Sequence, residues 1–74
     1  MSILRKTELN EFQEWLESLG WEQENTKDRQ EVLRMHHKEH GTLLLHDARE
    51  YYTTFGVGSR LVRTWLQRSL RHPL

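Results

Sequence analysis

The last part of the chain carries arginines at helical spacing. On a helical wheel over residues 59–71, four guanidinium groups and one amide share one side: Arg60, Arg63, Gln67, Arg68 and Arg71. No acidic residue lies in this segment. Guanidinium groups keep their charge and bind phosphate oxygens in pairs, so this surface predicts nucleic-acid binding. The alternatives are a solvated face, or ion pairs with the acidic side of the first predicted helix.

Four histidines lie around one predicted hairpin, at His36, His37, His40 and His46. A zinc site needs three or four ligands that converge in tetrahedral geometry. Adjacent His36 and His37 point to opposite faces of a strand, whereas His37 and His46 are expected to share a face. The chain has no cysteine. The sequence therefore predicts no metal, no cofactor and no catalytic residue, because a histidine base also needs a partner in hydrogen-bond reach.

The aromatic residues of one predicted strand and the glycine-rich segment after it also have a functional interpretation. Bases can stack on three aromatic side chains: Tyr51, Tyr52 and Phe55. Because one alternate set of side chains on a strand normally packs in the core, a core role is the preferred interpretation. Gly56-Val57-Gly58-Ser59 exposes backbone N–H groups at a helix start, which is a generic anion site. It lacks the third glycine and the lysine of nucleotide-binding loops.

Composition limits the fold and the setting. Seventy-four residues form one domain, 1–74, with 35% hydrophobic and 30% charged residues. The longest strongly apolar runs are three residues, so no segment is expected to span a membrane. The N-terminus has no apolar signal-peptide region, which predicts a cytoplasmic protein.

Charge is unevenly divided although the net charge is zero. Residues 1–31 carry four basic and eight acidic side chains, a net charge of −4. Residues 32–74 carry seven basic and three acidic side chains, a net charge of +4, and all five histidines. The chain is therefore electrically bipolar, which is the most informative feature of its composition.

Hydrophobic periodicity predicts an α+β fold of order α-β-β-β-α. A first helix is expected over residues 8–19, capped by Thr7 and ended by Gly20, with Trp21 folding back near Leu16. Strands are expected over 31–37, 42–46 and 51–55, with a possible short edge strand after Trp21. Ser59 is expected to cap a second helix that runs to about residue 71.

Both helices are predicted to pack on one face of a short antiparallel sheet. The helices should bury seven side chains: Leu9, Phe12, Leu16, Leu61, Val62, Trp65 and Leu66. A turn over residues 38–41 would place Leu33, Met35 and Leu44 in the core. Val32, Leu43 and Leu45 would then lie on the uncovered face, which implies either a β-bulge or a second molecule there, as in a homodimer or with another partner.

The glycine-rich segment and the element order carry a resemblance. Gly56-Val57-Gly58-Ser59-Arg60 followed by Arg63 resembles the double-stranded-RNA-binding domain, in which such a loop leads into a basic second helix. The resemblance implies that Arg60 and Arg63 contact phosphates. The ending Leu19-Gly20-Trp21 is similar to that of HicA-type toxins, which are ribonucleases of related fold. Their Gly-Ser-His catalytic motif is absent, and His36 and His37 lie only near its position.

These observations favour a small non-enzymatic binding module. The expected partner is nucleic acid, RNA or DNA, held by the basic side of the second helix. The competing interpretation is a protein-binding regulator or inhibitor, similar to small phage accessory proteins, that uses the acidic first helix or the exposed sheet face. A HicA-like ribonuclease is the third hypothesis.

Overall fold

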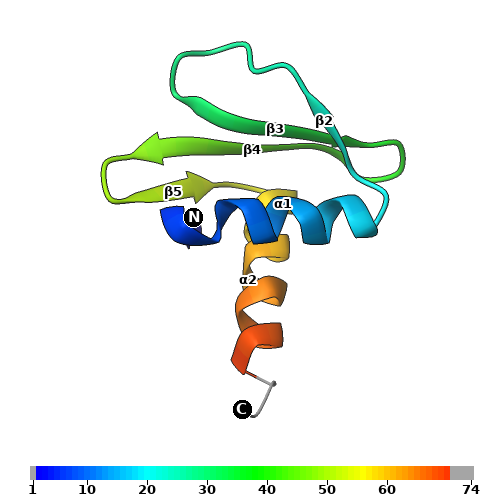
Figure 1. The fold of residues 1–74 in the computed structure, drawn as a ribbon. Helices are drawn as coiled ribbons and strands as arrows, with labels where there is room; N and C mark the ends of the chain where they lie inside the picture. Colours follow the sequence, from blue (N-terminus) through cyan, green and yellow to red (C-terminus); the bar gives the residue numbers. More distant parts are fainter. Residues whose placement is uncertain (1, 71–74) are drawn as a thin grey trace.

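The computed structural model describes residues 2–70, which form an antiparallel sheet of five strands with two helices on one face (Figure 1). The elements in chain order are β1 (Ser2–Arg5), the 3-10 turn η1 (Lys6–Glu8), α1 (Leu9–Ser18), β2 (Glu22–Glu24), β3 (Glu31–His37), β4 (Gly41–Ala48), β5 (Tyr51–Thr54) and α2 (Val57–Leu70). The strand order is β1-β5-β4-β3-β2. The α+β class and the order of helix, strands and helix are confirmed. β2 is the short edge strand expected after Trp21, and β1 adds a second edge strand that was not predicted.

The two ends of α1 differ in how well the sequence specifies them. Thr7 lies inside η1 and does not cap the helix, since Glu8 stands at the N-cap without a side-chain cap bond. At the other end Gly20 has φ +97°, and the Trp21 N–H donates to the Leu16 carbonyl at 3.1 Å. This left-handed ending with the returning Trp21, only 3% exposed, is the one predicted.

The register of the β3–β4 hairpin corrects the predicted core. His37 pairs with Gly41, so the turn has three residues and not four, and Arg34 pairs with Leu44. A shift of one residue moves every side chain to the other face. Leu43 and Leu45 are therefore buried under the helices at 1% and 0% exposed, beside Leu33 and Met35. Leu44 is only half-buried, on the face that neither helix covers.

This register also changes which residues form the uncovered face on which a second copy was expected. Leu43 and Leu45 lie in the core, and Val32, beside the bulge, is half-buried and packs against that core. A β-bulge does interrupt the pairing between Glu31 and Leu33, but the turn length already places Leu43 and Leu45 in the core.

Helix α2 starts against the sheet and then runs steeply away from it (Figure 1). It begins at Val57, two residues before the predicted start. Ser59 is buried and its hydroxyl donates to the Thr54 carbonyl at 3.0 Å, so it ties the helix to β5 and does not cap it. Val62 and Trp65 are buried as predicted. Leu66 is 40% exposed, contrary to prediction, because the later turns of α2 extend beyond the sheet.

An aromatic cluster joins the two helices. The Trp15 ring lies 5.5 Å from that of Trp65, and Phe12 lies 5.9 Å from both. The Trp65 indole N–H also donates to the Glu8 carboxylate at 3.4 Å. Aromatic pairs at these separations are favourable, so this cluster sets how α2 leaves the sheet.

Glu31 is a buried carboxylate that orders the loop before β3. It accepts the backbone N–H groups of Lys27 and Asp28, each at 2.6 Å, and two N–H bonds from Arg34 at 3.0 and 2.7 Å. Burial raises the pKa of the Glu31 carboxyl, but these hydrogen bonds and the Arg34 charge together outweigh it, so the pKa lies below its ordinary value. This carboxylate is structural, since its acceptor positions are occupied within the chain.

Candidate functional site

The arginine face is the largest set of predicted site residues that the structure describes. We use this name for the exposed side chains of α2 on one side of the helix: Arg60, Arg63, Gln67 and Arg68. Arg71 was predicted to belong with them and lies outside the described residues. Within residues 2–70 the ion pairs are Lys6–Asp47 at 2.9 Å and Arg34–Glu31 at 2.7 Å. The alternative, pairing with the acidic side of α1, is therefore not found for Arg60, Arg63 or Arg68, and Glu11, Glu14 and Glu17 are exposed.

The arginines differ in how the surroundings hold them. The Arg68 guanidinium lies over the Trp65 ring, 5.5 Å from its centroid, which limits where that charge can be presented. Arg60 is the fourth residue of α2 and lies in its first turn, and the Thr64 hydroxyl donates to its carbonyl at 3.0 Å. Arg63 points to the side of the wheel away from Leu61 and Trp65. The face thus has one cation fixed by an aromatic ring and two that extend from the helix.

A pocket of about 240 Å³ lies between the β3–β4 turn and α2, beside Arg60. Its lining combines aromatic, aliphatic and polar groups: Trp21, His40, Val57, Arg60, Leu61 and Thr64. The His40 ring lies nearly parallel to that of Trp21, at 17° and 6.3 Å between centroids. The His37 ring is 4.6 Å from His40 and 5.3 Å from Trp21, so three rings support this end of the molecule.

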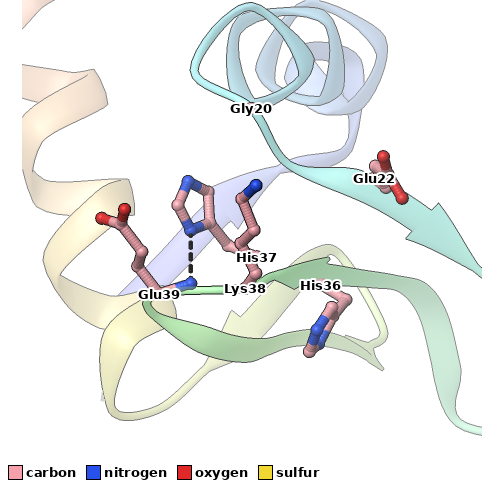
Figure 2. Close-up of a pocket in the computed structure, with 6 residues that line it drawn as sticks. All are labelled: Gly20, Glu22, His36, His37, Lys38 and Glu39. Atoms are coloured by element: carbon pink, nitrogen blue, oxygen red, sulfur yellow. Dashed lines mark hydrogen bonds between the residues drawn. The ribbon is translucent and has the colours of Figure 1, made fainter.

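A second pocket of about 340 Å³ lies on the other side of the same turn, between β3 and the end of α1 (Figure 2). It is lined by Gly20, Glu22, His36, His37, Lys38 and Glu39. His37 points toward Gly20 and its Nδ1 accepts the backbone N–H of Glu39 at 3.0 Å, whereas His36 points away (Figure 2). Because charges of both signs line it, this pocket favours no single class of ligand.

The histidines do not assemble a metal site in the part of the chain that the structure describes. No three His, Asp or Glu side chains within residues 2–70 are placed to hold one ion. His36 and His37 lie on opposite faces, as predicted. His46 does not share the face of His37, because the hairpin register places it opposite Glu31 on the uncovered face. Its Nδ1 is buried there without a hydrogen-bond partner.

The strand aromatics divide between the two faces of the sheet. Tyr52 is half-buried on the helix side, with the Lys6 ammonium 5.5 Å from its ring. Tyr51 and Phe55 are 39% and 62% exposed, and Tyr51 lies on the uncovered face with Ile3, which is 50% exposed. The alternation rule therefore describes this strand correctly: one set packs inward, and the other is accessible.

The glycine-rich segment serves packing more than anion binding. Gly58 is buried and its N–H donates to the Phe55 carbonyl at 3.1 Å, while the Arg60 N–H donates to the Gly56 carbonyl at 3.4 Å. The Ser59 hydroxyl is also directed inward. One backbone donor and one hydroxyl of the predicted anion site are thus already used within the fold.

Sequence reasoning found the arginines but missed the pocket beside them. His40 and Trp21 are far from Arg60 along the chain, and only the packing of the hairpin turn against α2 brings them together. Neither helix within residues 2–70 is long and apolar enough to cross a membrane. A scan against protein-family models found no match, and neither did searches of curated proteins and of solved structures.

Proposed function

We propose that this protein binds nucleic acid through the arginine face of α2. The observation that carries the proposal is that Arg60, Arg63 and Arg68 are all exposed, with no ion-pair partner in the described chain, on a helix that extends away from the sheet (Figure 1). No acidic side chain lies anywhere on α2. A projecting helix with one charged side can contact a phosphate backbone without interference from the sheet.

The spacing of these charges suits a phosphate backbone. Arg60 and Arg68 are eight residues apart, which is about 12 Å along a helix, with Arg63 between them. Each guanidinium can donate two hydrogen bonds to one phosphate. Neutralising about three phosphates releases as many counterions, so affinity should fall by roughly 10-fold to 50-fold between 50 and 200 mM salt.

Binding assays with four probes test the proposal. Gel shifts and fluorescence anisotropy would use single-stranded and duplex forms of RNA and DNA over a range of salt. Replacing Arg60 and Arg63 together by Ala should weaken binding and reduce the salt slope, with no loss of stability because exposed charges contribute little to folding. The matched control replaces exposed Arg5 and Arg29 by Ala, which removes the same charge elsewhere. No shift with any of the four probes at micromolar protein would reject the proposal.

A protein partner is the second candidate, and the uncovered sheet face favours it. Ile3 and Tyr51 expose apolar surface there, and Phe55 follows at the end of β5. Such a surface can bury area against another protein. Association through this face would be nearly insensitive to salt and unaffected by the arginine substitutions, which separates it from the first candidate.

A further inference from the structure

The pocket beside Arg60 joins an aromatic and aliphatic lining to a single cation. Val57 and Leu61 supply aliphatic surface, and Trp21 and His40 supply rings. The Thr64 hydroxyl already donates to the Arg60 carbonyl, and the Arg60 guanidinium is the one permanently charged group in the lining. Its lining contains no carboxylate. This combination suits a flat ring that carries a nearby negative charge.

The size of the pocket narrows the ligand to one ring system. About 240 Å³ is less than the volume of roughly 300–1,000 Å³ that holds a whole cofactor or drug-sized molecule. A nucleotide whose base enters the pocket and whose phosphate stays outside matches both the size and the cation. His40 lies in the exposed turn, so its ring is accessible from solvent.

The arginine face continues from this pocket along α2. Arg60, Thr64 and Arg68 are spaced by four residues, so they lie on one side of the helix at intervals of about 6 Å. A backbone that leaves the pocket at Arg60 can therefore reach Arg68 two turns later. Arg63 lies about 60° around the helix from Arg60, on the side away from Leu61, and does not line the pocket.

We infer that this pocket holds one unstacked base of a single-stranded nucleic acid while Arg60 and Arg68 hold its backbone. The inference rests on the proposed function and names its substrate class. A single strand presents free base faces, whereas a duplex must first unpair and unstack a base at a cost of a few kcal/mol. Stacking accepts any base, so the preference is for single strands and not for a sequence.

The test compares three probes of equal length and charge per strand. They are an oligothymidylate of about ten nucleotides, an abasic strand of the same length, and a duplex that contains the same strand. The wild-type protein should bind oligothymidylate about 5-fold to 150-fold more tightly than the abasic strand, the range expected for one stacked base. The duplex should bind with an affinity close to that of the abasic strand.

Three single variants assign this difference to the pocket. His40→Ala should remove most of the difference between oligothymidylate and the abasic strand and leave abasic binding unchanged. Arg60→Ala should weaken binding of both strands and also reduce the difference. Arg63→Ala, the matched control, should weaken both strands equally and keep the difference. As a check that does not depend on a variant, the ring-proton NMR signals of His40 should shift with oligothymidylate and not with the abasic strand.

Two results would overturn the inference, and they are distinguishable. If the abasic strand or the duplex binds as tightly as oligothymidylate, the pocket holds no base, while the arginine face remains a phosphate-binding surface. If none of the three probes binds, the proposed function fails together with the inference.

Discussion

α2 packs closely on the sheet at Gly58, and a single methyl group added there tests the fold. A Cβ added at Gly58 would overlap the Thr54 hydroxyl and would lie 3.1 Å from Thr54 Cβ and 3.4 Å from Leu43 Cγ. Thr54 and Leu43 are 0% and 1% exposed, so neither can move toward solvent. We therefore expect Gly58→Ala to push the start of α2 away from β5 and β4.

Two opposing effects set the size of the change. Alanine favours a helix over glycine by at most about 1 kcal/mol. Overpacking a closed core costs about 1–3 kcal/mol. Thr54 Oγ1 has no hydrogen-bond partner in the described chain, so it can rotate without losing one, but the contact with Thr54 Cβ remains. The expected net result is a decrease of about 1–2 kcal/mol in the free energy of unfolding.

Urea unfolding followed by circular dichroism measures this change, and a second substitution identifies its cause. Thr54→Ala removes the overlapping hydroxyl, so the double variant with Gly58→Ala should lose less stability than the sum of the two single variants. The unfolding slope should stay constant if only the native packing changes. A Gly58→Ala protein that is more stable than wild type would refute the close approach of α2 to the sheet.

Four other substitutions test three separate features. Leu16→Ala should lower the free energy of unfolding by about 2–4 kcal/mol, because Leu16 is 0% exposed. Leu66→Ala should lower it by less than about 1 kcal/mol, because Leu66 is 40% exposed. Equal losses in urea unfolding would contradict the orientation of α2. Gly20→Ala should cost about 1 kcal/mol or more in the same assay, since φ is +97° there and the new Cβ would lie 3.3 Å from His37 Nε2; an unchanged midpoint would contradict the left-handed ending. Glu31→Gln should destabilise the protein most at neutral pH. The pKa of Glu31 in the folded protein lies below its value in the unfolded chain. The stabilisation by the ionised carboxylate is therefore present above the unfolded pKa and is lost as the pH falls through the folded pKa. A difference in unfolding free energy between the variant and the wild type that does not shrink in acid would contradict this role of Glu31.

The helices and the central strands could be predicted because their signals are local. The ending of α1 follows from Gly20 and Trp21, and β3 begins and ends where alternation predicts. β1 was missed because four residues before a helix give too little alternation, and its partner β5 lies at the other end of the chain. Local sequence carries little information about such a distant pairing.

Face assignment failed for a different reason. The residues Lys38, Glu39, His40 and Gly41 permit a turn of three or four residues, and the two lengths place opposite faces of β4 against the helices. Leu66 was misassigned because the helical wheel gives a direction around the axis but not the point at which the helix leaves the sheet. The same wheel correctly predicts that Arg60, Arg63 and Arg68 are exposed, because charged side chains occupy the solvent-facing side along the whole helix.

The uneven charge of the two helices affects how a nucleic-acid strand would approach the protein. The two helices meet through uncharged rings, with Trp15 and Trp65 5.5 Å apart, so the acidic side of α1 and the arginine face do not neutralise one another in the described structure. A polyanion is attracted to one helix and repelled by the other, which orients the encounter. Because the net charge is zero, this long-range attraction is weak beyond about 10 Å at ordinary salt. Affinity for a nucleic acid would then have to come from short-range contacts, and a base held in the pocket beside Arg60, as we infer, would add a contact that phosphates alone would not supply.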